Sequence, residues 1–77
     1  MFSEKVKIEL SNAEAIILFE FLSRFRNKEK LEIVDQAEKR VLWDILSVLE
    51  SILTDPLKPN YLDLLEKARS EVRDEEF

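Results

Sequence analysis

Residues 35–53, DQAEKRVLWDILSVLESIL, decide the fold of this chain. Apolar residues recur there every three or four positions, which is the period of one face of an α-helix. Asp35 and Glu38 have the spacing of a capping box, and Pro56 stops the helix because proline disfavours helical geometry in the residue before it. The sequence predicts a helix over about 36–54, with an inward stripe of Val41, Leu42, Ile45, Val48, Leu49, Ile52 and Leu53.

Two more helices are expected on either side of this one. Ser11 and Glu14 have capping-box spacing and open a helix over about 12–26. Asn60 as N-cap and Asp63 near the positive end of the helix dipole open another over about 61–73. The expected inward residues are Ala15, Leu18, Phe21, Leu22 and Phe25, with Ile17 and Phe19 on the flanks, and then Tyr61, Leu62, Leu65, Ala68 and Val72.

The N-terminal residues have a different period. Val6, Ile8 and Leu10 alternate with polar residues, which predicts a short half-buried strand over about 5–10. Residues 31–34 are either a second short strand or a buried connection. The first strand is an edge, which could pair with 31–34 or with a second chain across a two-fold axis. The expected fold class is mainly α: three helices in antiparallel bundle-like packing, preceded by a short N-terminal β-strand.

Length and composition indicate a single folded domain over residues 1–77, ending in an acidic tail at 74–77. The chain is 45% hydrophobic and 38% charged, which is too apolar for a disordered polypeptide. It lacks both the apolar run of about 20 residues that a membrane span requires and a basic N-terminus leading into an apolar signal core. We therefore expect a cytoplasmic protein without membrane contact.

The residue types that are missing exclude several functions. The chain has no His, no Cys and no Gly. This removes the commonest proton-transfer and nucleophilic side chains, and also the glycine-rich loops that cradle phosphates. Glu14 and Glu38 lie near inner faces, but each occupies the third helical position of a capping box, which accounts for it. We expect no enzyme, no catalytic residue, no cofactor and no metal site.

Three apolar residues fall outside the expected inward stripes: Ile16, Phe19 and Trp43. At 100° per residue, Trp43 lies about 160° from the centre of its helix's stripe, and Ile16 stands opposite Leu18. Two explanations stay open. The N-terminal strand, Leu57 or the third helix could cover these residues within the monomer, or they could mark an interface, where tryptophan is an enriched anchor.

The leading hypothesis is a non-catalytic protein-binding module that acts as a homo-oligomer, such as a homodimer, or as an accessory subunit. The alternative is an immunity or antitoxin-like protein whose net charge of −5 steers it to a basic partner. A lesser alternative is nucleic-acid contact through the basic patch Arg24, Arg26, Lys28 and Lys30. The net charge argues against this last partner, and a helix C-terminus favours the same cations.

Part of the sequence also resembles a group of short uncharacterised bacterial proteins. The matching residues are Asp35-Gln36-Ala37-Glu38, Arg40, Leu42, Trp43, Pro59-Asn60-Tyr61 and Leu64-Leu65-Glu66-Lys67-Ala68-Arg69. This resemblance covers about half the chain. It implies a bacterial source, and brings with it no activity, cofactor or catalytic residue.

Overall fold

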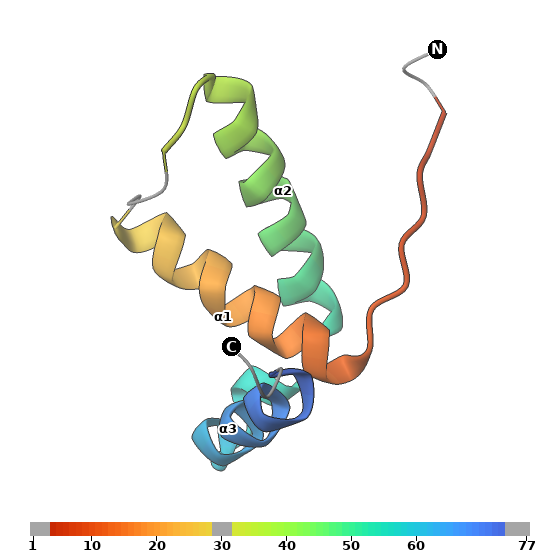
Figure 1. The fold of residues 1–77 in the computed structure, drawn as a ribbon, viewed down its shortest axis with the longest axis vertical. Coiled ribbons are helices and arrows are strands. Elements are labelled where there is room, and N and C mark those ends of the chain that lie inside the picture. Colours follow the sequence, from red (N-terminus) through yellow and green to blue (C-terminus); the bar gives the residue numbers. More distant parts are fainter. Residues whose placement is uncertain (1–3, 29–31, 74–77) are drawn as a thin grey trace.

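A computed structural model describes residues 4–28 and 32–73 and is mainly helical (Figure 1). It contains α1 (Asn12–Lys28), α2 (Gln36–Ile52) and α3 (Tyr61–Val72), with one 3-10 turn, η1 (Asp55–Leu57), before α3. The predicted packing of three helices is confirmed. Relative to the expected ranges, α1 extends two residues further, α2 ends two residues earlier and α3 one residue earlier.

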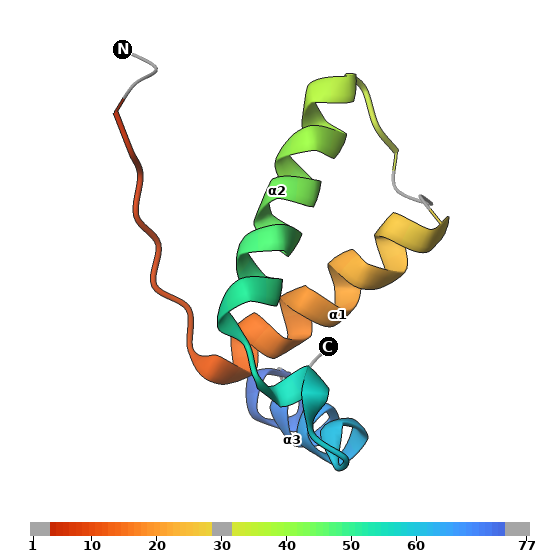
Figure 2. The ribbon, with the colours of Figure 1, turned by 180° about the vertical axis from the view of Figure 1, so that it is seen from behind.

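Helix α1 lies between the other two helices and packs against both of them. It meets α2 most closely where α1 begins and α2 ends, whereas α3 crosses on the other side of α1 (Figures 1 and 2). The core therefore contains side chains from all three helices around α1. Its buried members are Ala13, Ile16, Leu22, Leu46, Leu49, Leu53, Leu65 and Ala68.

Capping hydrogen bonds explain where α1 and α2 begin. At α1, the Glu14 backbone amide donates to Ser11 Oγ at 3.1 Å, and the Ser11 amide donates back to Glu14 Oε1 at 2.9 Å. At α2, the Ala37 amide donates to Asp35 Oδ1 at 2.8 Å. Glu38 accepts from the Val34 amide at 2.9 Å, one residue further out than in a standard capping box. These bonds account for both glutamates as structural residues.

The expectation that Asn60 caps α3 is wrong. Its backbone has φ −98° and ψ 27°, and its side chain makes no capping hydrogen bond. An N-cap residue normally adopts extended geometry, which aims its side chain back at the first amides of the helix. Here the Tyr61 amide donates instead to the Lys58 carbonyl at 3.1 Å, so the turn after η1 supplies the acceptor.

The predicted N-terminal strand is also wrong. Residues 4–10 form no strand and run as an extended segment beside α2, without ladder hydrogen bonds among the described residues; we call this segment the arm (Figures 1 and 2). A strand needs a partner for its backbone groups. The possible second strand at 31–34 does not supply one, because residues 32–34 form no strand and lie on the opposite side of the molecule from the arm. Leu31 falls outside the described residues, as does the acidic tail.

The inward stripe predicted for α2 was too wide. It also omitted Leu46, which is fully buried. The buried residues here are Leu46, Leu49 and the C-cap residue Leu53, and Leu42 packs against them. The β-branched residues of the same helix are exposed instead, and we call them the outer stripe: Val41, Ile45, Val48 and Ile52. The physical reason is that α2 has one large neighbour, α1, and a single helix covers only part of so broad an apolar surface. Likewise Leu62 of α3 is 77% exposed.

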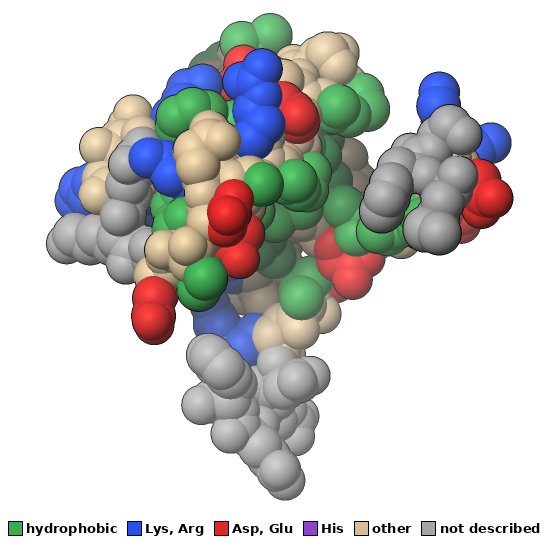
Figure 3. Space-filling view, turned by 90° about the horizontal axis from the view of Figure 1, so that it is seen from above, with side chains coloured by type: hydrophobic (Ala, Val, Ile, Leu, Met, Phe, Trp, Pro, Cys, Tyr) green, Lys and Arg blue, Asp and Glu red, His purple; other side chains and the backbone are tan. Residues whose placement is uncertain are grey.

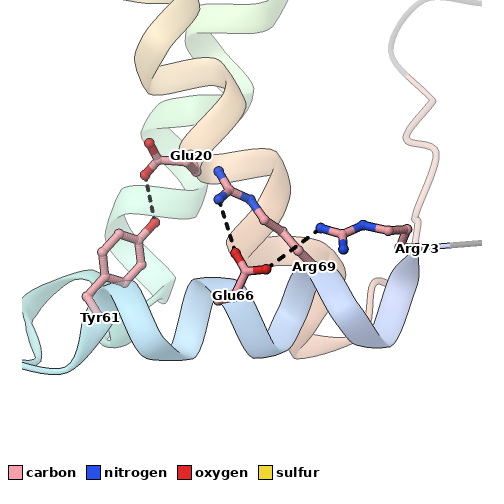
Figure 4. Close-up of polar contacts among 5 residues, drawn as sticks. All are labelled: Glu20, Tyr61, Glu66, Arg69 and Arg73. Atoms are coloured by element: carbon pink, nitrogen blue, oxygen red, sulfur yellow. Dashed lines mark hydrogen bonds and ion pairs between the residues drawn. The ribbon is translucent and has the colours of Figure 1, made fainter. Parts of the chain in front are cut away.

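One polar contact ties α3 to α1. The Tyr61 hydroxyl donates to Glu20 Oε1 at 3.0 Å, while Glu66, Arg69 and Arg73 form ion pairs along α3 (Figure 4). Burial, followed by the hydrogen bond to Glu20 and the charge of that residue, raises the pKa of Tyr61 to about 12. The neutral phenol is thus favoured in the folded state.

Replacing Ser11 by Ala should destabilise the protein, because it leaves the Glu14 amide without its acceptor. We expect the free energy of unfolding to fall by about 1 kcal/mol, measured by urea denaturation at one protein concentration. Ser70→Ala is the matched control, since Ser70 is exposed on α3 and its hydroxyl makes no hydrogen bond in the described part of the chain. An equal loss in both variants would contradict the capping role.

Tyr61 is the only tyrosine, so its titration can be followed directly by phenolate absorbance. We expect a midpoint near pH 12 in the folded protein and about 10 in urea. Because the folded pKa is the higher one, the stabilisation is complete below pH 10 and is lost as pH rises through 12. In Tyr61→Phe this alkaline loss of stability should be smaller; a folded midpoint near 10 would contradict the contact.

Candidate functional site

A groove lies between the arm and α2. Its walls are the three apolar arm residues, Val6, Ile8 and Leu10, and the outer stripe of α2. Ala15 and Leu18 of α1 also line it, and its volume is about 660 Å³. Figure 3 shows hydrophobic side chains on the face of the molecule turned toward the arm, which stands away from the helices. The groove is therefore an open apolar surface between two segments that are far apart in the sequence.

The arm and α2 each present a row of apolar side chains to this groove, because the spacing of these residues along the sequence places them on one face. In an extended segment, alternate residues point to one side, so Val6, Ile8 and Leu10 share a face. On α2 the outer stripe recurs at intervals of four, three and four residues, which also defines one face. The arm residues are 88%, 79% and 44% exposed in order, and the outer stripe ranges from 38% at Ile45 to 67% at Ile52.

The groove carries almost no charge. Among the described residues that line it, Asp44 is the one charged side chain. Its Oδ1 lies 3.8 Å from Nε of Arg40, one turn earlier on α2, so its charge is partly balanced. Exposed pairs of this kind add little stability, but they keep the groove close to neutral in a chain with a net charge of −5.

The three residues expected at an interface do not form one surface. Ile16 is only 3% exposed and belongs to the core with Leu65 and Ala68, so of the two explanations left open, cover within the monomer applies to this residue. Phe19 is half-buried and packs against the same core. The core side of α1 is thus rotated from the predicted one, because α3 covers Ile16 while Phe21 is 40% exposed.

Trp43 is half-buried and does not line the groove. The ammonium of Lys39 lies 5.4 Å from the centre of its ring, a cation–π contact within one turn of α2. Its buried indole N–H has no hydrogen-bond partner among the described residues. Trp43 sits one residue step from the leucines of α2, because the buried face is centred on them and not on the broader stripe that was predicted.

The basic patch is already engaged within the chain. Arg26 Nη1 donates to Glu50 Oε1 at 3.1 Å, which links α1 to α2. The Arg24 guanidinium lies 5.8 Å from the ring centre of Phe21. Lys28 is exposed, and Lys30 lies outside the described residues. Two of the three described cations thus have intramolecular contacts that a phosphate would have to replace.

The sequence did contain a signal for the groove. Each residue of the outer stripe immediately precedes a leucine, as Val-Leu or Ile-Leu, at 41–42, 45–46, 48–49 and 52–53. Successive helical residues are about 100° apart, so α2 carries two parallel apolar stripes and not one. One neighbouring helix can bury the leucines or the β-branched residues, and the structure assigns the leucines to the core.

The difference between the core and the outer stripe can be tested with the same chemical change at two isoleucines, Ile16 in the core on α1 and Ile52 in the outer stripe on α2. Ile16→Val should lower the free energy of unfolding by about 1 kcal/mol, because it leaves a small void in the core. Ile52→Val should change it by less than about 0.5 kcal/mol, because Ile52 is surface-exposed. Urea denaturation at low protein concentration measures both; a larger loss at Ile52 would contradict the assignment.

Because its lining is almost entirely aliphatic, the groove is suited to binding apolar side chains. Within residues 4–28 and 32–73, no cluster of three or more acidic residues is arranged to hold a metal ion. None of the helices described here has the length and apolar character to cross a membrane.

Comparison with protein-family models, curated proteins and solved structures finds no match to this chain.

Proposed function

We propose that this protein is a non-catalytic protein-binding module whose binding surface is the groove between the arm and α2. The observation that carries the proposal is the gathering of seven exposed aliphatic side chains, three from the arm and four from the outer stripe, around one nearly neutral groove. Contiguous apolar surface of this kind on a small protein is typical of a protein-protein interaction site.

The amount of exposed surface supports the proposal. The chain exposes 6766 Å², whereas a compact monomer of its mass, 9.1 kDa, would expose about 4900 Å². Its radius of gyration is 14.1 Å, against about 11.5 Å for a compact domain of this length. A standard interface buries about 800 Å² on each partner. The extended arm contributes to this excess of exposed surface, and its apolar side chains line the groove.

The shape of the groove favours a polypeptide over a small molecule. The outer stripe runs from Val41 to Ile52, which is 12 residues, and its first and last members are about 16 Å apart along the helix. Small-molecule pockets enclose most of their ligand and place a few polar groups inside. This groove is open along α2 and has one charged side chain, whereas an i, i+4, i+7, i+11 row is the spacing by which two helices pack.

The charge distribution supports apolar binding over the two alternatives. A basic partner would contact acidic groups, and Glu14, Asp35 and Glu38 already cap helices. Other exposed acids, such as Glu9 and Asp63, do not line the groove. Asp44 and Glu50 form ion pairs within the chain. Nucleic-acid contact would compete with the contacts of Arg24 and Arg26, and would work against the net charge of −5.

A photo-crosslinking amino acid placed at Val48 tests this proposal in cells that express the full chain. We expect irradiation to attach a polypeptide at this position, because Val48 lies in the outer stripe. The control position is Lys67, which is equally accessible on α3 but lies away from the groove. No adduct at Val48, or equal adducts at both positions, would contradict the proposal.

A further inference from the structure

We propose that the groove binds a second copy of this chain. The α2 helices of the two copies pack antiparallel across a two-fold axis, so that each outer stripe lies against the other and beside the other copy's arm. This inference rests on the proposed function and names its partner. Three properties of the described residues carry it: the symmetry of the outer stripe, its side-chain volumes and the neutrality of the groove.

The spacing of the outer stripe is the same in both directions. Its intervals of four, three and four residues are palindromic, so an antiparallel copy presents matching spacing without a shift in register. A two-fold interface requires such a self-complementary surface, because both copies use the same patch: if residue i contacts residue j of the partner, residue j contacts residue i of the partner. The same intervals form a d-a-d-a seam of a heptad repeat, the pattern of two helices packed side by side.

The order of side chains in the stripe fits this pairing. Read along the chain it is Val, Ile, Val, Ile, so in the antiparallel pair Val41 faces Ile52 and Ile45 faces Val48. Every contact then joins one valine with one isoleucine, so the combined side-chain volume is the same in each layer of the interface. A parallel pair would instead place Val against Val and Ile against Ile in alternate layers, with uneven volumes.

The charge of the chain restricts where two copies can meet. Two chains of net charge −5 repel each other, so contact requires a surface with few acidic groups. The groove meets this condition, because Asp44 is the one charged residue among those described in its lining and Arg40 lies beside it. In the antiparallel pair, the two Asp44 residues lie on either side of the axis and do not face each other.

A two-fold pair also explains the position of the arm. The arm runs beside α2 without packing on it, and Val6 and Ile8 are almost fully exposed (Figures 1 and 2). An inserted helix from a second copy would contact the arm and α2 together. Because the interface is closed, both grooves are filled at once and neither copy retains an open one.

Light scattering on a sizing column over a wide dilution range tests the pair. We expect the wild-type chain to have twice its mass of 9.1 kDa and to dissociate on dilution. Val48→Asp should remain monomeric at all concentrations, because it places a carboxylate in the seam. Leu62→Asp is the matched control: Leu62 is an exposed aliphatic residue on α3, so this variant should keep the wild-type mass.

Disulfide trapping tests the orientation, since the chain has no cysteine of its own. In the antiparallel pair, position 41 of one copy faces position 52 of the other, whereas the two copies of position 41 lie about 16 Å apart along the helix axis. Disulfides need Cα atoms within about 7 Å. Oxidation should therefore cross-link a mixture of Val41→Cys and Ile52→Cys chains, and should leave each variant alone uncross-linked.

The outcomes separate this inference from the proposed function. A dimer that Val48→Asp abolishes, with cross-links in the mixture alone, supports the antiparallel pair. Cross-links within either single variant would overturn the orientation. A monomeric wild-type chain at every concentration would overturn the second copy as partner. In that case an adduct at Val48 with a different polypeptide would still support the binding module.

Discussion

The contact of α2 with a single large neighbour is the constraint on which the rest of the structure depends. Helix α1 covers the leucines of α2 on one side and α3 on the other, and no fourth helix follows among the described residues. The apolar surface of α2 is broader than one helix can cover, so the outer stripe remains on the surface. The groove is thus a direct result of how three helices share one core.

The sequence predicted well those features that depend on neighbouring residues. The capping contacts at Ser11 and Asp35 are local, because the side chain and the amide it accepts from are two or three residues apart. The number of helices follows from such signals together with the apolar period. Asn60 is the exception: its backbone geometry is set by the 3-10 turn before it, which the sequence pattern did not reveal.

Which face of each helix is buried was predicted less well, because that depends on the positions of the other helices. Ile16 fell outside the predicted inward stripe and lies in the core, while Val48 was assigned to the core and lies on the surface. Both errors are rotations of about one residue step around a helix with apolar residues on most of its circumference. The arm was mistaken for a strand because alternation specifies a shared face but does not supply a hydrogen-bonding neighbour.

The choice of valine and isoleucine in the outer stripe has an entropic consequence. In a helix, a β-branched side chain is restricted almost entirely to one χ1 rotamer, whereas leucine, methionine or lysine retains more freedom. Immobilising flexible side chains is part of the cost of any association. At Val41, Ile45, Val48 and Ile52, much of that ordering has already occurred when α2 folds. The free protein therefore holds this surface in a conformation close to the one that the proposed contact requires.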